Sequence, residues 1–257
     1  MSKSRPTAPP DLAMPSYVGG WLGRRQERVL EHGFSEHQIA LDWWKKELKT
    51  AGLDAWEVSV DPLGSGATRL DRATLFELGQ LAHDHESTLR FLLHVLAWGS
   101  GIGSRNNRKR LAAFSNEELR RVNLDLLQRA ASIVQSGDAY ANRQAYSMLI
   151  RPGGGMVPGL GPAFFTKFLY FAGRGEGKVP PLILDARVAS RLYDAGWTDL
   201  PRSSRKNGYS YSYNWYTDTY VSYCELLARW ADESPLGTRP DEIERALFEG
   251  LGAPPPA

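Results

Sequence analysis

The sequence of 257 residues predicts an all-α fold. Apolar residues recur at spacings of three and four along most segments between Gly- and Pro-rich breaks, the pattern of helices packed on a core. The run Ser115-Asn-Glu-Glu has the form of a capping box, in which the Ser115 hydroxyl reaches the backbone N–H of Glu118. Strand-like alternation is limited to a short pair near residues 56–60, and the sequence shows neither solenoid repeats nor heptads.

The expected helices follow one another along the chain with Gly, Pro or polar breaks between them. Residues 24–49 predict two helices interrupted near Gly33, and residues 71–98 predict helix with a break around residues 83–87. Further helices are expected at residues 115–135, 139–150, 163–172, 185–195, 214–231 and 239–249.

The two ends of the chain are expected to be tails around one helical domain at residues 17–251. Residues 1–16 hold four prolines and few large apolar groups, and residues 252–257 hold three prolines. Neither tail is expected to be ordered or to carry the chemistry. A chain of this length can bury a sizeable core.

The composition excludes several classes of protein. Lys and Arg number 31 against 29 Asp and Glu, so the net charge gives only mild support for a polyanionic partner. The single cysteine, Cys224, excludes a disulfide framework and an iron–sulfur cluster held by four thiolates. Because the sequence has neither a bilayer-length apolar run nor a signal peptide, we expect a cytoplasmic protein without membrane, metal or cofactor.

A tight turn at residues 157–162, Val-Pro-Gly-Leu-Gly-Pro, is the most informative motif. Gly159 and Gly161 tolerate positive φ and the close approach of another backbone, and Pro162 suits the first turn of a helix. The turn is expected to join two helices as a hairpin whose N–H groups could hold a phosphate. The alternative is a plain structural turn.

This hairpin resembles the helix-hairpin-helix of DNA repair glycosylases, in which Leu-Pro-Gly-Val-Gly precedes a helix and an aspartate follows it. Here Asp185 lies 24 residues after Gly161. Two segments resemble prokaryotic proteins described as having the 8-oxoguanine DNA glycosylase fold. They are residues 161–168, Gly-Pro-Ala-Phe-Phe-Thr-Lys-Phe, and residues 184–188, Leu-Asp-Ala-Arg-Val.

The resemblance extends over about residues 90–232 and implies a helix-hairpin-helix DNA glycosylase-like bundle with two helical lobes around a cleft. The helix-hairpin-helix unit would lie at about residues 139–173. The implied activity is base flipping and cleavage of the N-glycosidic bond, which leaves an abasic site.

Two catalytic roles follow from the resemblance. Asp185 is implied to stabilise positive charge on the sugar and to take a proton from the nucleophile. Lys167 is the candidate amine for an associated lyase reaction, although the usual lysine position of the family holds Ala163 here, one helical turn earlier. The alternatives are an ordinary acid at a helix start and a lysine that reaches solvent from the helix edge.

Basic side chains gather in two places where a DNA backbone could bind. Contacts of this kind supply affinity without sequence preference, and a solvated charged surface is the alternative interpretation. The candidate backbone-binding residues are Arg105, Arg108, Lys109, Arg110, Arg205 and Lys206, together with Gly159 and Gly161 of the hairpin.

Aromatic residues follow the second basic cluster and are candidates for a base pocket, because stacking suits an unpaired base. Packing over the core is the alternative. The residues expected in the pocket are Trp215, Tyr216 and Tyr220.

The expected partner is double-stranded DNA that contains a modified base, bound by a monomer. The base is either an oxidised purine, as in 8-oxoguanine repair, or a hypermodified base of phage DNA, as in antiphage defence. The leading alternative is a non-catalytic helix-hairpin-helix DNA-binding module, and a weaker one is an RNA-binding protein that uses the tyrosine-rich segment.

Overall fold

The computed structural model describes residues 6–26, 38–64, 70–104, 106–151, 154–200 and 215–250, and the backbone of residues 203–205 and 208–210. Helices dominate these residues, which confirms the all-α prediction. The helices are α1 (Ser16–Leu22), α3 (Leu41–Thr50), α4 (Arg72–Gln80), α5 (His85–Ser100), α6 (Asn107–Ser115), α7 (Glu117–Gln135), α8 (Ala141–Leu149), α9 (Pro162–Ala172), α10 (Ala186–Asp194), α11 (Thr217–Glu233) and α12 (Pro240–Glu249).

Two short antiparallel ribbons interrupt the helices. Strands β1 (Ile150–Arg151) and β2 (Gly154–Gly155) lie between α8 and α9, within the expected hairpin unit. Strands β3 (Ser203–Arg205) and β4 (Gly208–Ser210) lie between α10 and α11. The strand pair expected near residues 56–60 does not form, because these residues run as turns and irregular coil.

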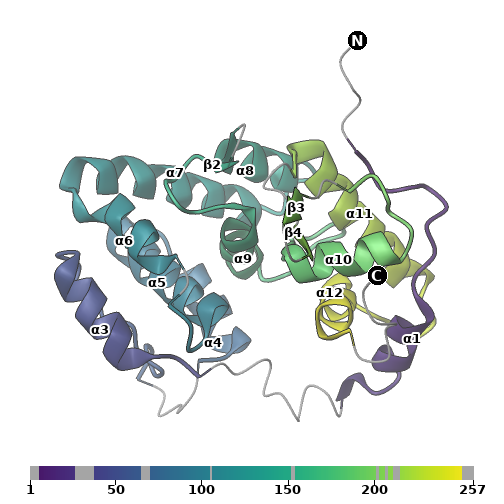
Figure 1. Ribbon diagram of the computed structural model, residues 1–257, viewed down its shortest axis with the longest axis horizontal. Helices are drawn as coiled ribbons and strands as arrows, with labels where there is room; N and C mark the ends of the chain where they lie inside the picture. Colours follow the sequence, from purple (N-terminus) through teal and green to yellow (C-terminus); the bar gives the residue numbers. More distant parts are fainter. Residues whose placement is uncertain are drawn as a thin grey trace.

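The helices form two lobes with α9 between them. Figure 1 shows α3, α4, α5 and α6 on one side of α9, and α1, α10, α11 and α12 on the other. Helix α9 contacts α4, α5 and α7, whereas α12 contacts α1, α10 and α11. The helical fold agrees with the bundle of two lobes around a cleft that the resemblance implies, with α9 between the lobes.

Helix α9 is buried because most of its side chains are apolar and face other helices, whereas Thr166 and Lys167 are its polar and charged exceptions. Its phenylalanines make edge-on or tilted ring contacts with other helices: Phe165 with Tyr146, Phe168 with Phe91, and Phe171 with Trp98. These contacts fix α9 between the lobes and so fix every side chain that it presents to the site.

Polar caps set the helix starts. The side chains of Asp71 and Asp84 accept backbone N–H bonds at the starts of α4 and α5. The predicted cap at Ser115 is wrong by one residue: Asn116 caps α7 by accepting from the N–H of Leu119. Ser115 instead ends α6, a helix that is not among those expected from the sequence.

The N-terminal segment is more ordered than expected. The Ala8 N–H donates to the Ser222 hydroxyl, and the Leu12 carbonyl accepts from Arg229 and Trp230 of α11. The range 1–16 expected for the N-terminal tail is therefore too long. Residues 252–257 lie outside the described part of the chain. Within the described ranges, no helix has both the length and the apolarity to cross a bilayer.

The buried His94 on α5 gives a prediction about stability. Its Nδ1 donates to the Arg90 carbonyl at 2.7 Å and its Nε2 accepts from the Ser59 N–H at 3.1 Å, so the ring is held neutral. Burial lowers the pKa of His94 to about 4. The unfolded chain, with a pKa of about 6.5, binds more protons below that pH, so stability is lost as the pH falls.

We expect His94 to remove about 2 kcal/mol of the free energy of unfolding between about pH 7.5 and pH 5. Urea unfolding of wild type and His94→Gln at both pH values measures the difference, because other titrating groups contribute equally to the two proteins. Equal pH dependence in the two proteins would contradict the prediction.

Candidate functional site

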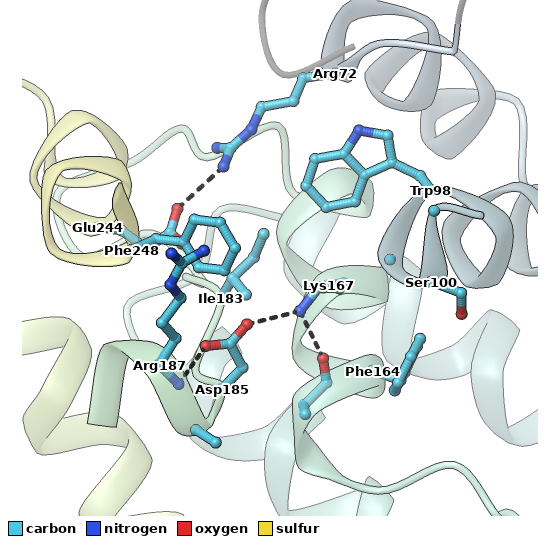
Figure 2. Close-up of a pocket in the computed structure, with 14 residues that line it drawn as sticks. Arg72, Trp98, Ser100, Phe164, Lys167, Ile183, Asp185, Arg187, Glu244 and Phe248 are labelled. Carbon is cyan, nitrogen blue, oxygen red and sulfur yellow. Dashed lines mark hydrogen bonds and ion pairs between the residues drawn. The ribbon is translucent and has the colours of Figure 1, made fainter. Parts of the chain in front are cut away.

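A pocket of about 350 Å³ opens between the two lobes. This volume lies within the range typical of small-ligand sites. Side chains from α4, α5, α9, α10 and α12 meet there, and Figure 2 shows their arrangement. The pocket is lined by Arg72, Trp98, Gly99, Ser100, Gly101, Ala163, Phe164, Lys167, Ile183, Asp185, Ala186, Arg187, Glu244 and Phe248.

Asp185 enters the pocket as the N-cap of α10. Its Oδ1 accepts from the backbone N–H of Arg187 at 3.0 Å and of Val188 at 3.2 Å. These two N–H groups at the N-terminal end of α10 fix the orientation of the carboxylate. The second oxygen, Oδ2, is directed to Lys167.

Buried hydroxyl groups hold the extended segment that leads to Asp185. The Leu184 N–H donates to Thr166 of α9 at 3.2 Å. The Tyr220 hydroxyl accepts from the Leu182 N–H at 3.1 Å and donates to the Leu182 carbonyl at 3.0 Å. The Tyr223 hydroxyl donates to the Ile183 carbonyl at 2.7 Å. Residues 182–184 are thereby fixed against α9 and α11, which fixes where Asp185 emerges.

Lys167 reaches the same pocket from α9, and the residue is only 7 % exposed. Its Nζ lies 3.3 Å from Asp185 Oδ2 and donates to the Ala163 carbonyl at 2.9 Å, as Figure 2 shows. The absence of a side chain at Gly99 makes room for it, because a Cβ there would lie 3.1 Å from both Lys167 Cδ and Phe164. The structure thus brings the two predicted catalytic side chains into contact.

A second charged pair closes the far end of the pocket. Arg72 of α4 and Glu244 of α12 form an ion pair at 3.4 Å, and both side chains are almost fully buried. The Arg72 guanidinium also donates to the Tyr170 hydroxyl and lies over the Trp98 ring. Burial raises the pKa of Glu244 to about 7, against the opposing effect of Arg72.

The aromatic walls of the pocket differ from those expected. As far as the described residues define it, the lining includes none of the three predicted aromatic residues. Trp215 and Tyr220 are buried in the core, where Tyr146 donates to the Trp215 carbonyl at 2.5 Å and stacks on Tyr220. Tyr216 is the half-buried N-cap residue of α11. The walls are instead Trp98, Phe164 and Phe248.

The hairpin lies at the start of α9, beside Phe164 of the pocket wall. Gly159 has φ +77°, and a Cβ there would come within 3.3 Å of the backbone of Lys109 and Arg110. Gly161 is the N-cap in an extended conformation and offers no side chain to cap the helix. Pro162 has no N–H, and the N–H groups of Phe164 and Phe165 donate to the Gly161 carbonyl at 2.9 and 3.0 Å. The Ala163 N–H is therefore the first-turn donor without an intrahelical partner that an anion could use.

The basic residues near the hairpin have different environments. Lys109 is exposed. Arg108 makes two hydrogen bonds to Glu47, and these bonds hold the pKa of that carboxyl below its usual value. Arg110 is buried, donates to the Gly159 carbonyl at 3.1 Å and lies 3.7 Å from the Phe164 ring centroid, so its position is structural.

The structure does not describe the side chains of the remaining predicted cations. Arg105 and Lys206 lie outside the described residues, and Arg205 is described only as backbone in β3. Over the described ranges, no cluster of His, Cys, Asp and Glu side chains has the form of a metal site. Cys224 is buried in α11, and burial raises its pKa to about 12, so it is not an accessible thiolate.

Comparison with known proteins identifies the family. A family model described as "Putative 8-oxoguanine DNA glycosylase OGG-like protein" matches residues 27–248, which include every residue that lines the pocket. Searches of curated proteins and of solved structures return no match. The family is one of DNA-binding proteins of the DNA glycosylase type, and both the fold and the hairpin agree with it. The chain belongs to this OGG-like 8-oxoguanine DNA glycosylase family.

Proposed function

We propose that the protein is a DNA glycosylase that flips a modified base out of double-stranded DNA and cleaves its N-glycosidic bond. The observation that carries the proposal is the 3.3 Å contact between Lys167 and Asp185 inside a pocket bordered by the hairpin helix. Cleavage of this bond requires a carboxylate beside the sugar, and an amine next to it supplies the nucleophile for an associated lyase step.

Asp185 is proposed to act on the sugar. When the bond between C1′ and the base breaks, the electron pair leaves with the base and positive charge develops on the sugar ring. A carboxylate beside C1′ stabilises that charge and accepts a proton from the attacking nucleophile. Its two backbone hydrogen bonds keep it oriented throughout the step.

Lys167 is proposed to supply the amine for an associated lyase step. If its Nζ attacks C1′, the sugar ring opens to an imine that is bonded to the protein, and the strand can then be cut at the abasic site. If water attacks instead, the product is an intact abasic site, and Lys167 serves only to orient Asp185.

The flipped base is proposed to lie between the pocket walls Trp98 and Phe248, which come from opposite lobes. Aromatic faces hold any base by stacking, whereas hydrogen bonds to its edge select it. The polar end of the pocket offers Arg72 as a donor and Glu244 as an acceptor or, when protonated, a donor. The substrate is proposed to be an oxidised purine or a hypermodified base of phage DNA.

The hairpin at Gly159 and Gly161 is proposed to bind a backbone phosphate, with Lys109 adding charge beside it. Arg105, Arg205 and Lys206 are proposed to contact the flanking strand. The protein is proposed to act in the cytoplasm as a monomer.

Incubation with duplexes that carry oxidised, alkylated or glucosylated bases tests the proposal. Abasic sites formed by the protein are revealed as strand breaks after hot alkali. We expect one class of base to be released by wild type and not by Asp185→Asn. Tight binding to DNA without release of any base would favour the non-catalytic DNA-binding module.

A further inference from the structure

The N-terminal helix α1 packs against α12, the helix that supplies Glu244 and Phe248 to the pocket. Figure 1 shows α1 beside α12, on the side away from α9. The segment that contains α1, residues 6–26, precedes the range that the family model matches, so the family assigns it no role. The large apolar side chains of α1 are nevertheless buried, which makes this segment part of the folded core.

Helix α12 presents different side chains to the pocket and to α1. Glu244 and Phe248 lie one turn apart and line the pocket. The next residue after each of them, Arg245 and Glu249, is turned by about 100° around the helix axis and faces α1. Because all four belong to one short helix, a contact that fixes Arg245 and Glu249 also fixes the pocket wall.

Trp21 of α1 joins the two helices through a buried hydrogen bond. Its Nε1 donates to Glu249 Oε2 at 2.7 Å, and the other oxygen of that carboxylate accepts from Arg245 Nε at 3.0 Å. Trp21 is only 4 % exposed, and the Arg245 guanidinium lies 6.0 Å from its ring centroid. Hydrogen bonds to a charged group are stronger than those between neutral groups, so this contact holds the end of α12 in place.

The last turn of α12 depends on such contacts from outside the helix. The final carbonyl groups of a helix lack intrahelical partners, so helix ends are the parts that fray. Phe248 lies in this turn, shortly before Gly250, which follows the helix with φ +61°. The position of the aromatic wall is therefore set by what packs against the turn.

The segment is itself fixed on both sides of Trp21, so it can support α12. Arg25 forms an ion pair at 3.3 Å with Glu242 in the first turn of α12. The Leu12 carbonyl accepts from Trp230 Nε1 of α11 at 2.9 Å. Trp21 lies between these two attachments in the sequence and contacts the end of α12 that carries Phe248.

We propose that residues 6–26 form a brace that sets where α12 places Phe248, and that Trp21 is the positioning residue within it. The inference rests on the proposed function, in which Phe248 stacks on the flipped base. Trp21 is not part of the described pocket lining and acts through Glu249. A displaced Phe248 loses contact with the base face, whereas Asp185 keeps its own bonds at the start of α10.

The dissociation constants of two DNA duplexes test the brace. One duplex carries the base that wild type releases, and the other carries a tetrahydrofuran residue, which has no base to stack. Both are measured with protein that carries Asp185→Asn, so that no base is released. Trp21→Phe keeps an aromatic ring but loses the N–H donor. We expect it to weaken binding of the first duplex about tenfold and to change binding of the second by less than about twofold.

Three further variants separate positioning from a general loss of packing. Trp44→Phe makes the same change at an indole of α3 that is 1 % exposed and whose N–H has no hydrogen-bond partner among the described residues. It should leave both dissociation constants unchanged. Glu249→Ala removes the acceptor of Trp21 and should reproduce the tenfold loss. In Phe248→Ala protein the wall is already absent, so Trp21→Phe should add less than about a twofold loss.

The outcomes separate the brace from the proposed function. Equal weakening of the two duplexes by Trp21→Phe, or no weakening of either, would overturn the brace whatever the activity. If wild type releases no base, the base-bearing duplex that the Asp185→Asn protein binds most tightly takes the place of the first duplex. A tenfold effect of Trp21→Phe on that duplex alone would leave the brace standing while the glycosylase proposal fails.

Discussion

Asp185→Asn is expected to lower the single-turnover rate of base release by about 10³-fold. The substitution replaces the negative oxygen beside the sugar with an amide, which neither stabilises an oxocarbenium ion nor accepts a proton. The rate is measured with excess protein over a duplex that carries the base released by wild type.

The fold should survive this change, because asparagine caps helices about as well as aspartate. The side-chain oxygen of the introduced asparagine can still accept from the N–H groups of Arg187 and Val188 that Asp185 now binds. Asp84→Asn is the matched control, since Asp84 caps α5 at the end far from the pocket-lining residues. That variant should release the base at the wild-type rate. Retention of more than about a tenth of the activity in Asp185→Asn would exclude the proposed role.

Lys167→Gln is expected to lower the yield of borohydride-trapped protein–DNA complex by at least about 100-fold. Borohydride reduces an imine between protein and sugar to a stable bond, and glutamine cannot form the imine. The complex is measured as a shifted band on a denaturing gel.

Breaking a buried ion pair completely lowers the free energy of unfolding by about 3–5 kcal/mol. Lys167→Gln should lower it by less, because the glutamine amide retains N–H donors for Asp185 and Ala163. Lys45→Gln on the exposed face of α3 is the control and should trap normally. A cross-link of unchanged yield in Lys167→Gln would assign the amine to another residue. No trapping by wild type, together with base release, would assign the attack to water.

Much of the fold follows from local sequence patterns. The apolar run at residues 163–172, with Pro162 before it, predicts helix α9, and the structure confirms it over Pro162–Ala172. The sequence does not reveal helix α6, because four polar or charged residues, Asn107 to Arg110, stand at its start and its pattern is weakly amphipathic. Adjacent Ser and Asn residues both suit the cap of α7, and the sequence favours Ser115 because Glu118 completes a capping box with it.

The site is predictable only in part. The proximity of Asp185 and Lys167 follows from the hairpin motif, which places them on consecutive helices. The pocket walls do not follow from local pattern: Trp98 and Phe248 lie 150 residues apart in the sequence and meet only through the packing of α5, α9 and α12. Tyr220 has an aromatic ring that could stack on a base, but its burial depends on neighbours far along the chain.

The buried hydroxyl groups that bond to the backbone of residues 182–184 position Asp185 independently of the aromatic walls of the pocket. Asp185 is anchored through residues 182–184 by Thr166 of α9 and by Tyr220 and Tyr223 of α11, whereas Trp98 and Phe248 stand near the C-terminal ends of α5 and α12. On the proposed function, a change at Phe248 therefore alters how a flipped base is stacked, while the bonds to residues 182–184 keep Asp185 in place. The same bonds would hold the carboxylate through changes elsewhere in the pocket lining.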